Sequence, residues 1–166
     1  MKKKLIISIP AALLLILLYC TMFSFSSEEA EVSGSRSHDI CMKAVELVDA
    51  LNGQTDWSEI QKNAYADRYE TFVRKLAHFT EYCISGVLLY ILLSQWVTFS
   101  AKIYILMILW ILLTASFDEI HQLFVSGRDG NIPDVLLDTL GGSTGIFLSY
   151  RISHYFHKKR TKKETL

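Results

Sequence analysis

Four apolar segments limit what this chain can fold into. A helix of about 20 residues, rising 1.5 Å per residue, crosses the ~30 Å hydrocarbon layer of a bilayer. The segments run from about Leu5 to Phe25, Leu76 to Trp96, Ala101 to Phe124 and Ile132 to Ile152. At 166 residues, a single compact unit is expected. The sequence therefore predicts an all-α polytopic membrane protein with four transmembrane helices.

The first segment has two interpretations. Its basic start, Lys2 to Lys4, also fits a cleaved signal peptide. However, the apolar run is long and no small-residue cleavage site follows it. We therefore expect an uncleaved anchor, in which Pro10 is tolerated because membrane helices accommodate proline.

Charged residues are segregated along the chain although the net charge is zero. The tail from Arg151 carries six bases and one acid, whereas residues 26–74 carry ten acids and five bases. Because basic flanks mark the cytoplasmic side, we expect both termini in the cytoplasm and an even number of crossings. The bases adjoin apolar runs, so a nucleic-acid partner is not expected. The predicted parts are an anchor (1–25), an extracytoplasmic stretch (26–74), a three-helix core (75–152) and a basic cytoplasmic tail (153–166).

The extracytoplasmic stretch is predicted to hold one or two short helices. Residues 26–37 are small and polar, which is typical of a linker. Apolar residues then recur at helical spacing over 38–51, and Asn52-Gly53 ends this run. A second helix is expected to start near Asp56, with Glu59 completing a capping box. The pattern fits a membrane-surface pair and a solvated hairpin equally well.

Ionisable residues occur at membrane depth in three of the four segments. The second segment starts outside, the third ends outside and the fourth starts outside, so their polar stretches should lie together in the outer leaflet. Such groups cost several kcal/mol unless paired or hydrated, and they are functional by default. The predicted site comprises Lys75, His78, Glu81, Tyr82, Asp118, Glu119, Gln122, Arg128, Asp134 and Asp138.

These residue types support more than one chemistry. A histidine beside carboxylates suits acid–base catalysis, for which His78, Glu81 and Asp118 are the candidates. The same donors suit a divalent cation, although the metal signal is weak. Arg128 fits a phosphate or carboxylate ligand and a solvated loop charge equally well. The residues assigned to headgroup binding are Lys75, Tyr82, Glu119, Gln122, Arg128, Asp134 and Asp138.

Three glycines in the fourth segment predict close helix packing. Gly141 and Gly145 are spaced as in a small-xxx-small motif, which lets two membrane helices approach closely. This approach should bring Asp134 and Asp138 to the second and third segments.

Three motifs occur in the polar stretches. They are Lys75-x-x-His78-Phe79-x-Glu81-Tyr82, Asp118-Glu119-Ile120-His121-Gln122, and Gly127-Arg128 with Asp134-Val135-x-x-Asp138-Thr139-x-Gly141-Gly142. Together they resemble the VanZ-like family over roughly residues 74–149. The resemblance implies a small polytopic bacterial membrane protein; the founding member of the family is associated with reduced susceptibility to the glycopeptide teicoplanin. Asp138 departs from the family pattern, in which asparagine is frequent.

Three functions are consistent with these patterns. The favoured one is an outward-facing polar pocket, in a bacterial inner membrane, that binds or modifies an anionic envelope lipid or lipid-linked precursor. A second is a structural or regulatory partner of cell-envelope machinery, acting through the extracytoplasmic helices. A third, a proton- or ion-coupled carrier, is disfavoured because the inner halves of the segments contain no charge. The sequence decides neither catalysis nor oligomeric state.

Overall fold

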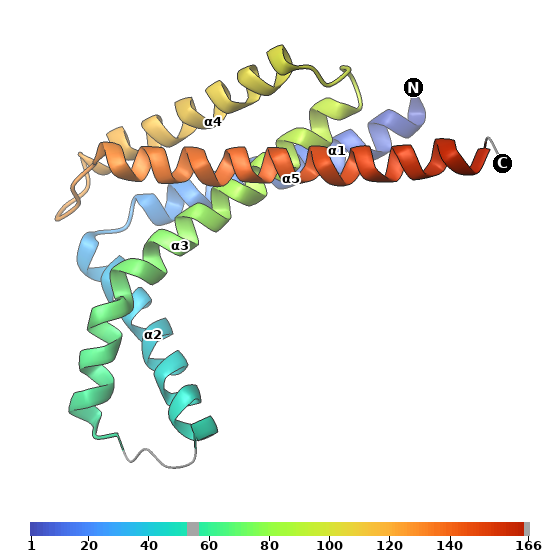
Figure 1. Ribbon diagram of the computed structural model, residues 1–166. Helices are drawn as coiled ribbons and strands as arrows, with labels where there is room; N and C mark the ends of the chain where they lie inside the picture. The colour runs from blue at the N-terminus through green and yellow to red at the C-terminus, as the bar shows by residue number, and fades with distance from the viewer. Residues whose placement is uncertain (53–56, 165–166) are drawn as a thin grey trace.

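The computed structural model describes residues 1–52 and 57–164, and over these residues the chain is all-α, as predicted. Helices α1 and α4 run in one direction, and α3 and α5 in the other (Figure 1). The two termini lie at the same end of this bundle, and the α4–α5 loop lies at the opposite end. The helices are α1 (Lys2–Ser26), α2 (Ala30–Asn52), α3 (Glu59–Ser94), α4 (Ala101–Gln122) and α5 (Ile132–Glu164).

Three helices in the described part of the chain, α1, α3 and α4, are long and apolar enough to cross a membrane. The fourth predicted span lies in α5, which is long enough but falls short in hydropathy. Two aspartates, three glycines and several hydroxyl residues cause this, because they replace apolar side chains in its first five turns.

The stretch that was predicted to be extracytoplasmic differs from its prediction at both helices. Residues 30–37 were predicted as linker, yet α2 already begins at Ala30. Packing against α3, which buries Cys41 on α2, overrides the low helix propensity of this serine- and glycine-rich start. The second helix has a capping box, but it is formed by Ser58 and Gln61 and not by the predicted Glu59. Asp56 and Gly53 lie outside the described residues.

Helix α3 joins the second predicted external helix and the second predicted span into one helix of 36 residues. At 1.5 Å per residue this helix is about 54 Å long, well beyond the ~30 Å hydrocarbon layer. Its N-terminal half pairs with α2, and this pair projects away from the other helices (Figure 1). Its C-terminal half packs in the bundle against α1 and α5.

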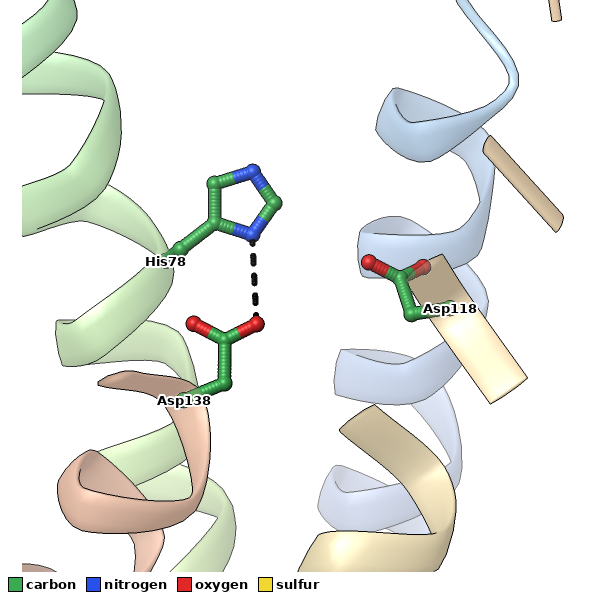
Figure 2. A group of neighbouring side chains, drawn as sticks. All are labelled: His78, Asp118 and Asp138. Carbon is green, nitrogen blue, oxygen red and sulfur yellow. Dashed lines mark ion pairs between the residues drawn. The ribbon is translucent and has the colours of Figure 1, made fainter. Parts of the chain in front are cut away.

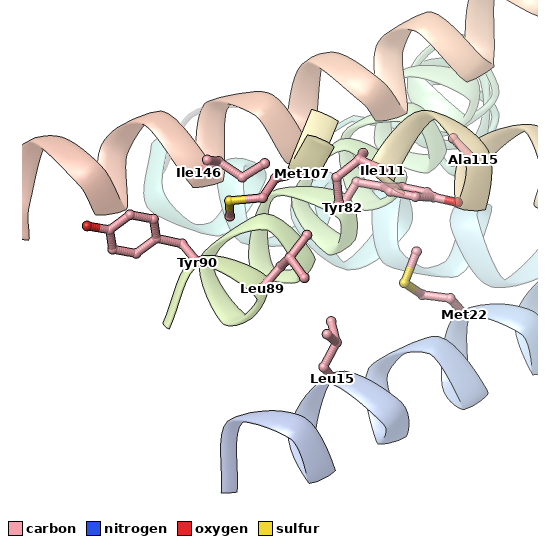
Figure 3. Packing of buried hydrophobic residues seen from close by; sticks show 9 residues of the cluster. All are labelled: Leu15, Met22, Tyr82, Leu89, Tyr90, Met107, Ile111, Ala115 and Ile146. Carbon is pink, nitrogen blue, oxygen red and sulfur yellow. The ribbon is translucent and has the colours of Figure 1, made fainter. Parts of the chain in front are cut away.

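The bundle core combines residues from α1, α3, α4 and α5 (Figure 3). Ile111 of α4 and Ile146 of α5 are fully buried there. Helix α1 is also joined to the core by polar contacts, since the Tyr19 hydroxyl accepts hydrogen bonds from Ser85 Oγ (2.7 Å) and Trp110 Nε1 (3.2 Å). Helix α1 therefore packs as part of the bundle.

The predicted close approach of the glycine-bearing helix is confirmed. A Cβ atom on Gly145 would overlap the carbonyl oxygen of Cys83, and one on Gly86 would overlap that of Gly142. Backbone therefore meets backbone along the α3–α5 contact, which is how membrane helices gain van der Waals contact where lipid supplies no hydrophobic drive.

Candidate functional site

A cavity of about 310 Å³ lies where α3 enters the bundle and α5 begins. It is bounded by α3, α4, α5, the α4–α5 loop and Ala30 at the start of α2. Seven of the ten predicted site residues line it, from all three predicted segments and the loop: Lys75, His78, Glu119, Gln122, Arg128, Asp134 and Asp138.

Lys75 of α3 and Asp134 of α5 form an ion pair across the cavity wall. Asp134 also accepts a hydrogen bond from Asn131 Nδ2 (2.8 Å), so its carboxylate is held from two sides. A carboxylate in the first turn of α5 is further favoured by the positive end of the helix dipole. The close packing of α5 thus brings Asp134 to the second predicted segment, as expected.

Asn131 organises the start of α5 and was not among the predicted site residues. Its Oδ1 accepts the backbone N–H of Asp134 (3.1 Å), and its own N–H donates to Glu119 Oε2 (2.8 Å). The signal was present in the sequence, because asparagine shortly before a first-turn proline is a helix-cap pattern. Arg74, which was also not among the predicted site residues, lines the cavity too.

A cluster of three side chains, two of them buried and one half-buried, adjoins the cavity. His78 of α3, Asp118 of α4 and Asp138 of α5 each place one ligand atom within 4.8 Å of the other two (Figure 2). His78 Nδ1 lies 3.9 Å from Asp138 Oδ2, which is too long for a hydrogen bond. Asp138 is only 1% exposed. The sequence placed these residues at one membrane level but did not predict their contact.

Arg128 is hydrogen-bonded to two backbone carbonyl groups of the chain. Its Nε donates to the Glu28 carbonyl (3.0 Å) and its Nη2 to the Phe25 carbonyl (3.1 Å), both at the C-terminal end of α1. Burial and the neighbouring Arg74 charge lower the pKa of Arg128 from its usual value, but a guanidinium remains protonated at neutral pH. Arg128 therefore connects the loop to α1 while lining the cavity.

An apolar groove of about 1190 Å³ lies on the other side of the cluster, between α1 and α4. Leu113 and Phe117 of α4 line it and are more than half exposed, so it opens to the surroundings of the bundle. Two predicted site residues, Tyr82 and Asp118, line this groove and not the polar cavity. Asp118 thus faces the groove and also approaches His78 and Asp138.

Two ionisable residues of the motifs line neither of these spaces. Glu81, the predicted acid–base partner of His78, lines neither the polar cavity nor the apolar groove. His78 instead approaches Asp118 and Asp138. His121 stacks on Phe23 with ring centroids 4.3 Å apart and bonds Ser27 through Nε2 (3.0 Å), so it packs against α1.

The fold and this cavity define a class: an all-helical bundle with apolar spans and charged residues gathered at one end. A family model described as VanZ/LLP1 matches residues 11–153. The chain belongs to the VanZ/LLP1 family, and together with its apolar helices this membership indicates a membrane protein. The match includes most of α1 and the α2–α3 pair, and so extends beyond the predicted range of 74–149. Searches among curated proteins and among solved structures gave no significant match.

Proposed function

We propose that the chain is a four-span protein of a bacterial inner membrane that binds the phosphate-bearing headgroup of an envelope lipid or lipid-linked precursor. Residues 26–74 then lie outside the cell and the basic tail 153–166 inside. One observation carries the proposal: a charged cavity and an apolar groove are both lined by members of a single cluster, His78, Asp118 and Asp138. An amphiphile presents the same two surfaces, a charged headgroup joined to a hydrocarbon chain.

The fourth span is supported by how α5 distributes its side chains. Asp138, Gly141, Gly142 and Gly145, which lower its hydropathy, are buried against the other helices. Its exposed face over the same turns is apolar, which is the pattern expected of a helix whose outer side contacts lipid. That face comprises Leu136, Leu140, Phe147, Leu148 and Ile152, each at least 47% exposed.

Cysteine labelling tests this topology. In a variant lacking the native cysteines, Glu46→Cys should react with a membrane-impermeant maleimide on intact cells stripped of any outer barrier. Lys159→Cys should react only after permeabilisation. Both positions are exposed in the structure, so burial does not limit the reaction. If α5 did not cross the membrane, Lys159→Cys would be labelled from the outside along with Glu46→Cys, and the proposal of four spans would fail.

Three cationic side chains line the cavity and could bind an anionic group, beside four carboxylates. Arg74 and Lys75 enter from α3 and Arg128 from the loop, and His78 lies deeper on the same helix as the first two. Lysine and arginine bind phosphate through charge-assisted hydrogen bonds, which are stronger than neutral ones. The carboxylates on the opposite wall, Glu119 and Asp134, are already bonded by Asn131 and Lys75.

Lipid retention tests the headgroup proposal. The full chain is purified in detergent, and its affinities for phosphatidylglycerol, undecaprenyl phosphate and phosphatidylcholine are compared by native mass spectrometry. We expect preference for the anionic lipids and at least about 10-fold weaker binding for Arg74→Met or Lys75→Met, because a hydrogen bond to a charged group contributes about 1.5–3 kcal/mol. Removal of an equally charged side chain elsewhere should have little effect.

The matched control is Lys102→Met, since Lys102 is exposed at the start of α4, far along that helix from the cavity. Equal loss in Lys102→Met and Lys75→Met would show that general surface charge attracts the lipid.

In cells, His78→Ala should abolish any effect of the protein on teicoplanin susceptibility while leaving its membrane level unchanged. An unchanged effect on teicoplanin susceptibility in that variant would show that the cavity is not needed for this effect.

The two alternatives receive different support. A carrier needs polar groups along the whole bundle, but the described core away from the cavity consists of residues such as Leu89, Met107 and Ile146. A partner of envelope machinery would use the projecting α2–α3 pair, on which Leu51 and Ile60 are 76% and 82% exposed. Headgroup binding has the more specific support, because it uses the charged residues of three helices at once.

A further inference from the structure

Asp138 is a buried carboxylate without a hydrogen-bond partner, and His78 lies 3.9 Å from it. Neither of its oxygen atoms has a hydrogen bond among the described residues, and the residue is only 1% exposed. Burying a carboxylate in this way costs several kcal/mol unless a proton or a cation neutralises it. The side chain points toward His78 (Figure 2). A proton, a charged His78 at 3.9 Å or a bound cation would neutralise this carboxylate, and the unbonded oxygen atoms leave room for a cation to bind directly.

The side chains around Asp138 are those that bind transition metals. His78 and Asp118 come from two other helices, and the ligand atoms of the three residues lie within 4.8 Å of one another. Ligands of a tetrahedral zinc ion are separated by about 3.3 Å, given bond lengths of about 2.0–2.1 Å. Cation binding would thus require these side chains to move slightly closer together.

A fourth residue holds one of the ligands in place. Gln122 Nε2 donates a hydrogen bond to Asp118 Oδ2 (3.2 Å), and both residues are buried. Outer partners of this kind orient metal-binding carboxylates and raise metal affinity. Asp118 thereby has one oxygen engaged by Gln122 and another for a further ligand.

We infer that His78, Asp118 and Asp138 form a binding site for a divalent transition cation, with Zn²⁺ and Mn²⁺ as the best matches. Imidazole suits zinc and iron, and carboxylates suit manganese, so a mixed set of one nitrogen and two oxygens favours these ions over an all-oxygen ion such as Ca²⁺. Three protein ligands leave at least one coordination position open, as in catalytic zinc sites. His78 and Asp138 also line the polar cavity, so that position is accessible to a water or a phosphate oxygen.

Metal uptake by the full chain tests this site. The protein is purified with a tag that contains no histidine, treated with a chelator and titrated with Co²⁺, Zn²⁺ and Mn²⁺. We expect uptake of about one ion per chain, with a Co²⁺ absorption spectrum typical of nitrogen and oxygen ligands. Asp118→Asn and Asp138→Asn should each weaken binding at least 10-fold, and a cation-dependent rise in melting temperature should be lost in both.

The matched control is another histidine–aspartate pair. His38 Nε2 lies 3.2 Å from Asp67 Oδ1 on the projecting α2–α3 pair, where Asp67 is 70% exposed. The double variant His38→Gln/Asp67→Asn should bind the cation as the native chain does. Equal uptake by the native chain and by the double variant Asp118→Asn/Asp138→Asn would overturn the site, as would failure of the native chain to bind any of the three ions.

If Asp118→Asn or Asp138→Asn does not fold, Gln122→Ala provides a second test of the cation site. This substitution leaves all three ligands in place and should weaken metal binding about 10–100-fold, which is typical for loss of an outer partner. Unchanged affinity in a folded Gln122→Ala protein would contradict the proposed orientation of Asp118. Metal uptake is measured without added lipid, so the cation site and headgroup binding can fail separately.

Discussion

Replacing Gly145 with leucine should prevent the chain from assembling into a folded bundle. A Cβ atom at this position overlaps the carbonyl oxygen of Cys83, and backbone cannot turn aside as a flexible side chain can. Overpacking of a rigid core lowers stability by about 1–3 kcal/mol or more. Here the added side chain would force α3 and α5 apart, and these two helices form the most extensive helix contact in the described structure. We expect aggregation or loss of the monodisperse peak in detergent, with Gly145→Ala intermediate.

The control for this substitution is Thr80→Leu. Thr80 lies on α3 and is exposed, so the added methyl groups meet lipid and not backbone. This variant should elute and melt as the native protein does. A Gly145→Leu protein that melts at the native temperature would show that α3 and α5 can separate without cost, and that the cavity does not depend on their contact.

Replacing Arg128 with alanine should lower stability by about 1–3 kcal/mol. The substitution removes two hydrogen bonds from a charged donor to carbonyl groups of residues 25 and 28, each of which contributes about 1.5–3 kcal/mol when buried and less at this half-buried site. It also leaves those carbonyls at the end of α1 without the guanidinium. Thermal unfolding followed by tryptophan fluorescence measures the effect.

Two further variants separate structure from ligand binding at Arg128. Arg128→Lys keeps the charge but not the planar group that reaches two carbonyls, so it should recover only part of the stability. Arg68→Ala, an exposed arginine of α3, should change the melting temperature little. If Arg128→Ala melts normally but loses phosphatidylglycerol, the side chain acts on the ligand and not on the α1 end.

Much of the bundle followed from hydropathy and charge, because these patterns act over whole segments. The direction of each helix placed the three polar stretches at one end, and in the structure Lys75, His78 and Asp134 line one cavity. Continuity of α3 was missed although no glycine or proline occurs between Gly53 and Gly86. The change from polar to apolar residues suggested two helices, but composition changes alone do not end a helix.

The details of the site depend on contacts between helices, which spacing along one helix does not reveal. The predicted acid–base candidates were His78, Glu81 and Asp118. The structure brings Asp118 and Asp138, 40 and 60 positions further along the chain, near His78. Arg128 was assigned to a ligand or to solvent, and its bonds to α1 were missed because backbone carbonyls leave no trace in the sequence.

The unbroken α3 helix has a mechanical consequence. His78 and Lys75, which line the cavity, belong to the same rigid rod whose other end pairs with α2 outside the bundle. A helix transmits tilt and rotation along its length, so a force applied to the projecting tip would reposition both side chains. Thermodynamic reciprocity then requires that a ligand preferring one tilt of α3 also changes the affinity of the tip for whatever contacts it. Contacts at the projecting α2–α3 tip and ligands in the cavity would therefore influence each other through α3.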